Sequence, residues 1–148
     1  MSLAQLNQAM CIACGATNRV PADKPAAAAR CGRCGETLGL DAPAEIDDAR
    51  LTSLLEKSTG LVLLDVWAPW CGPCRAIAPH FKSAAKTLAG QARLVKLNAD
   101  HSELVRQLGV SGIPALILFR DGRIIDRKAG LLSAEMLTSW VRSHIGTA

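Results

Sequence analysis

The chain has 148 residues, enough for one domain of about 110 residues and a small additional unit. Hydrophobic residues make up 49% of it but aromatic residues only 3%, so any core must be aliphatic. The formal net charge is +4 with no concentrated run of Lys and Arg, so the charge does not require a nucleic-acid partner. No apolar run is long enough to cross a bilayer, and no membrane association is predicted.

The first forty residues carry little hydrophobic patterning. Residues 1–10 show no strong pattern, and we expect them to be mobile. Residues 11–40 are too poor in large hydrophobic residues to form a core without a cross-link such as a metal. The Ala-Pro-Ala stretch around Pro43 is typical of a linker. We therefore divide the chain into an N-terminal unit at 1–40 and a second domain at 41–148.

The second domain shows alternating helix and strand patterns. The expected elements are a helix at 46–58, a strand at 61–67, a helix at 71–88, a strand at 93–98, a short helix at 102–108, strands at 115–120 and 123–128, and a helix capped by Ser133. A short strand around 44–46 is weakly indicated. Asp121-Gly122 predicts a hairpin between the last two strands. Parallel strands joined by helices, followed by a hairpin, predict an α/β fold: a mixed central sheet with helices on both faces.

No secretory signal pattern is visible near Met1, and we expect a cytoplasmic protein. In that reducing compartment, clustered cysteines more often bind metal or perform redox chemistry than form structural disulfides. All six cysteines fall in three C-x-x-C pairs. Their flanking residues differ, so two kinds of chemistry are expected.

The third pair, Cys71 and Cys74, lies where an apolar strand gives way to a helix. Unpaired N–H groups at a helix N-terminus stabilise a thiolate, which is the nucleophilic form of cysteine. Cys74 lies one helical turn further along the same face, so it can attack a mixed disulfide formed at Cys71. The intervening Gly72 and Pro73 tighten the turn. A bare C-x-x-C would also suit zinc.

The segments W-A-P-W-C-G-P-C at 67–74 and G-I-P-A-L-I-L-F at 112–119 resemble the thioredoxin family, and the resemblance covers roughly residues 45–146. It implies a thioredoxin fold and a protein-disulfide reductase that cycles between dithiol and disulfide. Cys71 would attack the target and Cys74 would resolve the intermediate. The implied partners are disulfide-containing proteins and a thioredoxin reductase that uses NADPH. The resemblance implies no organic cofactor.

The resemblance also assigns roles to residues outside the cysteines. Asp65 would be a buried acid with a raised pKa that exchanges a proton with Cys74, and Lys96 would be its neighbour. The alternatives are an Asp65 in contact with water and a Lys96 whose ammonium reaches solvent. The remaining residues would bind substrate: Trp70, Gly72, Pro73, Ile113, Pro114 and Gly130. Among these, Ile113-Pro114 resembles the family's cis-proline site, and the alternative is an ordinary trans proline. For Gly130, the alternative is a glycine that only forms a turn. Where family members often carry Thr after this proline, the chain has Ala115.

The first two pairs have the spacing of a zinc ribbon: Cys11, Cys14, Cys31 and Cys34. Glycine follows each pair, at Gly15 and Gly35, which lets backbone N–H groups turn toward the sulfurs. Four thiolates suit one structural Zn²⁺, with iron or two disulfides as alternatives. With the following domain, this pattern resembles zinc-binding bacterial thioredoxins of the thioredoxin-2 type. A structural, a partner-binding and an oxidant-sensing role for the zinc unit are all open.

A second class of function is a binding protein. A zinc ribbon could hold a client or nucleic acid, or act as a redox-sensing chaperone, with the thioredoxin fold as a scaffold. The intact Cys71/Cys74 motif with Asp65 argues against this reading, because a scaffold needs neither. The absence of aromatic residues in 1–40 argues against nucleic acid. We expect a monomer.

Overall fold

A computed structural model describes residues 7–21 and 28–145. Its main sheet contains β3 (Ala44–Glu45), β5 (Ala92–Asn98), β4 (Leu61–Trp67), β6 (Ala115–Arg120) and β7 (Arg123–Ala129), in that order across the sheet. The first three strands are parallel, and β6 and β7 are antiparallel to their neighbours. The predicted mixed sheet and hairpin are therefore confirmed, and the weakly indicated strand near residue 44 is present as β3.

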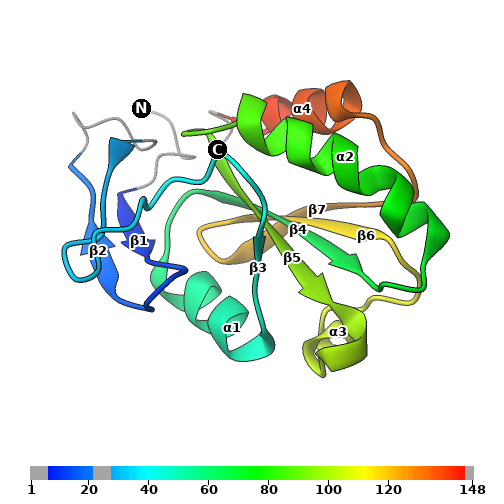
Figure 1. Cartoon of the computed structure of the whole chain (residues 1–148), viewed down its shortest axis with the longest axis horizontal. Coiled ribbons are helices and arrows are strands. Elements are labelled where there is room, and N and C mark those ends of the chain that lie inside the picture. Colours follow the sequence, from blue (N-terminus) through cyan, green and yellow to red (C-terminus); the bar gives the residue numbers. More distant parts are fainter. Residues whose placement is uncertain (1–6, 22–27, 146–148) are drawn as a thin grey trace.

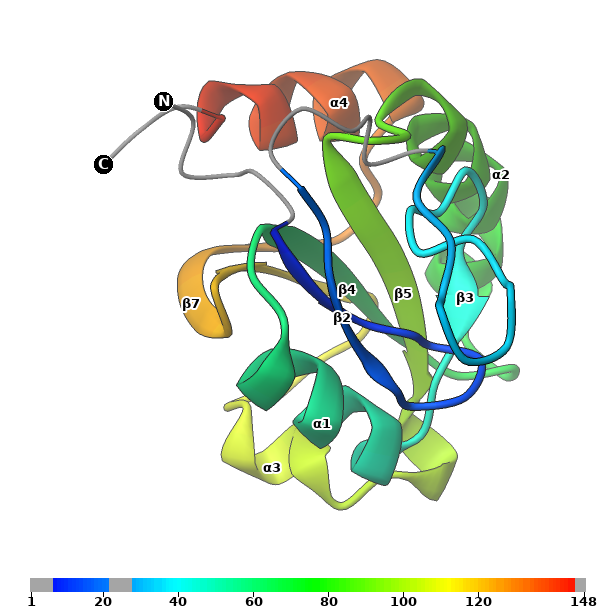
Figure 2. The same ribbon diagram turned by 90° about the vertical axis from the view of Figure 1, so that its left-hand side faces the viewer.

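Helices cover both faces of this sheet, as expected (Figure 1; Figure 2). One face carries α2 (Gly72–Thr87) and α4 (Ala134–Ser143), and the other carries α1 (Asp48–Lys57) and α3 (Leu104–Gln107). The helix expected at 102–108 is shorter than predicted and follows a separate 3₁₀ turn, η2 (Ala99–His101). The carboxylate of Asp48 accepts hydrogen bonds from the N–H groups of Glu103 and Leu104, which fixes the start of α3.

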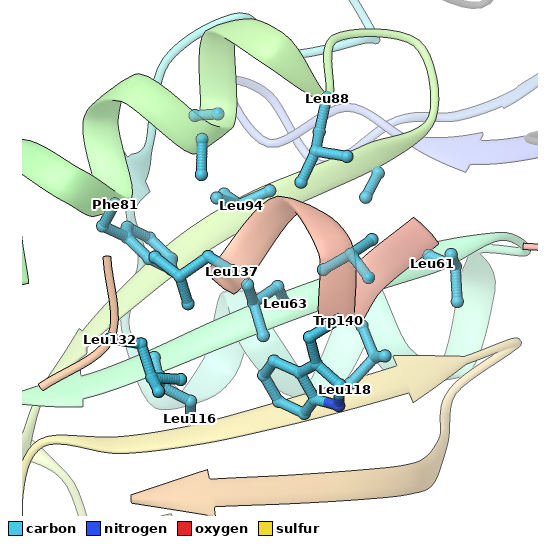
Figure 3. Close-up of a cluster of buried hydrophobic side chains, with 14 of the residues drawn as sticks. Leu61, Leu63, Phe81, Leu88, Leu94, Leu116, Leu118, Leu132, Leu137 and Trp140 are labelled. Atoms are coloured by element: carbon cyan, nitrogen blue, oxygen red, sulfur yellow. The ribbon is translucent and has the colours of Figure 1, made fainter. Parts of the chain in front are cut away.

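The core between the sheet and helices α2 and α4 is mainly aliphatic, as the composition predicts. Figure 3 shows strand leucines meeting Phe81, Leu137 and Trp140 from the two helices. Leu137 and Val141 are fully buried, and Trp140 nearly so. These residues recur at helical spacing, which explains why α4 packs along the sheet.

The opposite core also contains a residue from the far N-terminus. Met10 is fully buried among apolar residues of α1, β4 and β5. It belongs to β1 (Gln8–Met10), which forms an antiparallel hairpin with β2 (Thr17–Arg19). The expectation that residues 1–10 are mobile is therefore wrong for residues 7–10, and residues 1–6 lie outside the described part of the chain.

Hydrogen bonds to a distant loop hold β1 in place. The N–H of Met10 donates to Ser58 Oγ at 2.8 Å, and the N–H of Thr59 donates to the carbonyl of Gln8 at 2.8 Å. These partners are separated by about fifty residues in the sequence. The N-terminal hairpin is thus attached to the end of α1 and the loop that follows it, where Figure 2 shows it in front of the sheet.

The N-terminal unit has only a small apolar cluster of its own, and most of the members are small: Ala9, Cys11, Val20, Ala29, Cys31 and Leu38. This agrees with the expectation that it needs a cross-link to fold. None of the helices in the described ranges is long and apolar enough to cross a membrane.

Candidate redox and metal centres

The redox pair lies at the start of α2, as predicted. Cys71 and Cys74 form a disulfide, with their Cα atoms 5.2 Å apart. Cys71 is the N-cap of α2, and its Sγ accepts a hydrogen bond from the N–H of Cys74 at 3.2 Å. After reduction, this donor and the helix N-terminus would favour a thiolate at Cys71 over a thiol. The pair therefore has the local geometry of a reversible dithiol centre.

A loop and a strand end line the surface beside the disulfide. The Ile113–Pro114 peptide bond is cis, as the resemblance implied, and the Ile113 carbonyl oxygen lies 3.8 Å from Cys71 Sγ. The N–H of Gly130 donates to the carbonyl of Pro114 at 3.2 Å, so Gly130 lies next to the same loop. Residues 109–117 and 127–130 line a groove of about 440 Å³. An extended peptide segment could bind along it.

The two tryptophans near the disulfide have different environments. Trp70 is 68% exposed, and its indole N–H donates to Asp100 at 2.9 Å, which orients the ring at the surface. Gly72 and Pro73 are also exposed. Trp67 is partly buried against the two cysteines. Trp70, Gly72 and Pro73 thus form an accessible surface around the disulfide.

Asp65 is fully buried in β4, and neither carboxylate oxygen has a hydrogen-bond partner among the described residues. Burial raises the pKa of Asp65 to about 7; the charge of Lys96 acts against this rise, and that of Glu45 adds to it. The alternative of a water-exposed Asp65 is therefore excluded.

Lys96 is next to Asp65 in the register of β4 and β5, and Glu45 is next to Lys96 in the register of β5 and β3. The ammonium of Lys96 lies 3.8 Å from Glu45 Oε1 and 4.6 Å from the centre of the Trp67 ring. The indole N–H of Trp67 donates to Glu45 Oε2 at 3.4 Å. Sequence reasoning missed Glu45, although it lies in the weakly indicated first strand.

The other four cysteines converge on one point. Their sulfur atoms all lie within 4.8 Å of one another, with 3.6 Å between Cys11 and Cys34 and 3.7 Å between Cys14 and Cys31. In a tetrahedral site with Zn–S bonds of about 2.3 Å, neighbouring sulfurs are about 3.8 Å apart. The cysteines are free rather than disulfide-bonded. The donor set therefore fits a four-thiolate zinc ion.

Each cysteine pair forms a tight turn that ends in glycine. The N–H of Gly15 donates to the carbonyl of Cys11, the N–H of Gly35 donates to that of Cys31, and both glycines have a positive φ. The backbone N–H of Cys34, the side chain of Asn18 and the N–H of Arg33 lower the pKa of Cys31 to about 6. Asn18 also accepts a hydrogen bond from the N–H of Gly32 at 2.9 Å. Sequence reasoning did not single out Asn18.

Comparison with known proteins gives two family matches that together span most of the chain. The thioredoxin family matches residues 42–143, and a second family described as "Thioredoxin 2, N-terminal" matches residues 10–36. The chain belongs to the thioredoxin family. Thioredoxins are thiol-disulfide oxidoreductases, so the predicted fold and class of enzyme are confirmed.

Individual thioredoxins support this assignment. Thioredoxin C-3 of Corynebacterium nephridii is 34% identical over 137 residues, covering 92% of this chain and 94% of that protein. The thioredoxin of Haemophilus influenzae is 39% identical over 101 residues, covering 68% and 94%. The solved structure of a mutant thioredoxin from Halobacterium salinarum is 30% identical with a TM-score of 0.61, covering 73% of this chain and 94% of its own.

The pKa of Asp65 predicts how the stability of this thioredoxin depends on pH. Between about pH 4 and 7 the folded state keeps a proton on Asp65 that the unfolded state has lost. The proton on Asp65 stabilises the folded state fully below about pH 4. Its contribution to the free energy of unfolding declines as the pH rises to 7 and is absent above 7. Asp65→Asn should therefore raise the free energy of unfolding at pH 8 by up to about 4 kcal/mol.

Urea unfolding of the oxidised protein at pH 5 and pH 8 measures this effect. The free energy of unfolding should differ less between pH 5 and pH 8 in Asp65→Asn than in the wild type. Asp41→Asn, which changes an exposed carboxylate, serves as the matched control. An equal pH dependence in wild type and Asp65→Asn would show that Asp65 is ionised in the folded protein.

Proposed function

We propose that this thioredoxin is a general protein-disulfide reductase whose reacting pair is Cys71 and Cys74. The observation that carries the proposal is the position of Cys71 as the N-cap of α2, with its sulfur accepting the N–H of Cys74. A thiolate at this position is stabilised by the groups that are already there, so the reduced enzyme needs little rearrangement to react.

The reaction exchanges one disulfide for another. The Cys71 thiolate attacks one sulfur of a target disulfide and releases the other target sulfur as a thiolate, leaving a mixed disulfide. Cys74 then attacks Cys71 Sγ, which forms the Cys71–Cys74 disulfide and releases the second target thiolate. The target gains two electrons, and the enzyme pair loses two. A thioredoxin reductase that draws electrons from NADPH would restore the dithiol.

Asp65 and Lys96 would manage the proton during this cycle. Cys74 must lose a proton before it attacks, and a carboxyl group with a pKa of about 7 can exchange one near neutral pH. The positive charge of Lys96, which is paired with Asp65 in the strand register, would lower the pKa of Asp65 and so favour release of its proton. This role is supported by the burial of Asp65 and its lack of other partners in the described part of the chain.

The target would bind across the surface around the disulfide. Trp70, Gly72 and Pro73 are exposed on one side of it, and Ile113, Pro114 and Gly130 line the groove on the other. Backbone groups near Ile113 would pair with an extended target segment, which makes recognition tolerant of sequence. Such tolerance suits a reductase with many protein substrates.

We propose that Cys11, Cys14, Cys31 and Cys34 hold one structural Zn²⁺. Such an ion has no open coordination position, so it would contribute folding free energy rather than take part in disulfide exchange. Figure 1 supports the separation of roles, because the β1–β2 hairpin and the start of α2 lie at opposite ends of the molecule. Partner recognition by this unit is a second role compatible with the same metal site.

We divide the chain into a zinc-ribbon module at 1–40 and a thioredoxin domain at 41–148, with the stretch around Pro43 as the linker. We place the protein in the cytoplasm, because a dithiol reductase requires a reducing environment to be reduced again. A monomer is proposed because every predicted strand and helix is accounted for in one compact unit. No nucleic-acid partner is proposed.

A coupled assay tests the proposed reaction. Insulin serves as the target, with NADPH and a bacterial thioredoxin reductase as the source of electrons. We expect NADPH oxidation to depend on both this chain and insulin, with one NADPH consumed per disulfide reduced. The control shows that a chemical dithiol reduces the Cys71–Cys74 pair. If NADPH oxidation then does not exceed the rate of the reductase alone, the proposal is contradicted.

A further inference from the structure

Arg93 is a buried cation that neither centre accounts for. It is 3% exposed, and in β5 it lies on the same face as the apolar Val95 and Leu97. Its Nη1 donates to the carbonyl of Met10 at 2.9 Å, but Nε and Nη2 have no hydrogen-bond partner in the described residues. A buried charge with unsatisfied donors is costly unless an opposite charge lies nearby.

The residue whose carbonyl Arg93 binds, Met10, directly precedes Cys11 of the proposed metal centre. Burial lowers the pKa of Arg93 to about 10, and the charge of Cys11, the residue after Met10, opposes that change. Arg93 forms no ion pair with a carboxylate in the described part of the chain. Four thiolates around one Zn²⁺ would form a dianionic cluster, so a loaded site would supply the charge that the guanidinium lacks.

A second arginine of the thioredoxin domain lies against the turn from Cys11 to Gly15, which carries the first pair of proposed metal ligands. Arg50 of α1 lies so close to Gly15 that a Cβ at Gly15 would collide with its Nη1. Gly15 ends the turn that begins at Cys11. Arg50 thus lies against the turn at 11–15, and Arg93 binds the residue directly before that turn.

We propose that Arg93 is a positioning residue that couples metal binding at Cys11, Cys14, Cys31 and Cys34 to the docking of β1 on the thioredoxin domain. The inference rests on the proposed zinc site. The guanidinium holds the Met10 carbonyl directly before the first ligand. A loaded cluster would place an opposite charge beside it. Metal loading and β1 docking therefore stabilise each other.

This coupling predicts opposite effects of one substitution in the two metal states. Two donors of the buried guanidinium have no partner among the described residues, and in the metal-free protein no dianionic cluster offsets that cost. Arg93→Met removes that charge while keeping a long side chain. It should leave the metal-free protein at least as stable as the wild type and make the zinc-loaded protein less stable. A packing role alone would destabilise both states equally.

The experiment compares wild type, Arg93→Met, Arg93→Lys and the exposed control Arg123→Met. The first measurement is the zinc content of the wild type under reducing conditions, which tests the zinc site by itself. Zinc affinity is then measured by competition with a chromophoric chelator. We expect about 10- to 100-fold weaker binding in Arg93→Met, an intermediate loss in Arg93→Lys and no change in Arg123→Met.

Thermal unfolding and hydrogen exchange provide readouts of docking that do not depend on activity. Removing zinc from the wild type should speed exchange at the amides of Met10 and Thr59, which bridge β1 and the loop after α1. In Arg93→Met this effect of zinc should shrink. If the wild type contains zinc, two results would overturn the proposal. One is an Arg93→Met variant that binds zinc as tightly as the wild type. The other is a variant that is destabilised equally with and without zinc. A wild type without zinc would instead overturn the metal site.

Discussion

Cys71→Ser should reduce turnover in the insulin assay to below about 0.1% of the wild-type rate. A serine hydroxyl stays protonated where the cysteine forms a thiolate, so the helix N-terminus that favours an anion has nothing to stabilise at neutral pH. The substitution changes one atom at a residue that is 5% exposed, so the fold should be retained. A circular dichroism spectrum matching the wild type would establish this.

Cys74→Ser is the matched variant, because it changes the same atom at the other member of the pair. It keeps the attacking thiolate but removes the resolving thiol, so a mixed disulfide between Cys71 and insulin should accumulate on a non-reducing gel. Cys71→Ser should give no such adduct. If Cys71→Ser instead accumulated the mixed disulfide with insulin and Cys74→Ser did not, Cys74 would be the attacking residue and Cys71 the resolving one. Full turnover in either variant would exclude the proposed exchange.

The second large effect is expected at the metal centre. Under reducing conditions, the wild type should contain one zinc ion per chain and two rapidly titrated thiols, Cys71 and Cys74. Cys34→Ser should lose zinc on dialysis against a chelator that the wild type resists, because structural four-ligand sites bind with about 10–16 kcal/mol and one ligand is gone. Atomic absorption and a thiol titration measure both quantities.

The loss of zinc should unfold the N-terminal unit and leave the thioredoxin domain folded. The apolar cluster of that unit contains mostly small residues and cannot hold it together without the metal. Hydrogen exchange should therefore become fast in residues 28–40 of Cys34→Ser while β4 stays protected. Glu36→Gln, at a neighbouring exposed position, is the control. Retention of one tightly bound zinc by Cys34→Ser would exclude Cys34 as a ligand.

The sequence was sufficient to predict those elements whose hydrophobic pattern matches their burial. All residues of β4 from Leu61 to Val66 are buried, which corresponds to the apolar run expected for a central strand. Asp65 stood out because it interrupts that run. The sequence predicted two kinds of cysteine centre because Trp70 precedes one pair and Gly-Pro lies within it, whereas glycine follows each of the other two pairs.

The features that were missed depend on contacts between distant parts of the chain. Strand β1 is three residues long and has no alternation, and it is held by Ser58 and Thr59 from the loop after α1. Arg93 resembled an ordinary polar residue at a strand start. Its alternation with Val95 and Leu97 was a usable signal, since it placed a cation on an apolar face. Nothing local could show that Met10 would cover it.

The bond between Met10 and Arg93 also has a consequence for the order in which the molecule assembles on the ribosome. The four proposed metal ligands span residues 11–34, whereas Met10 and Arg93 are 83 residues apart. Because synthesis proceeds from the N-terminus, the ligands emerge well before β5 does. With the proposed zinc site, a nascent chain would capture the metal early, and the loaded turn would already be formed when Arg93 leaves the exit tunnel.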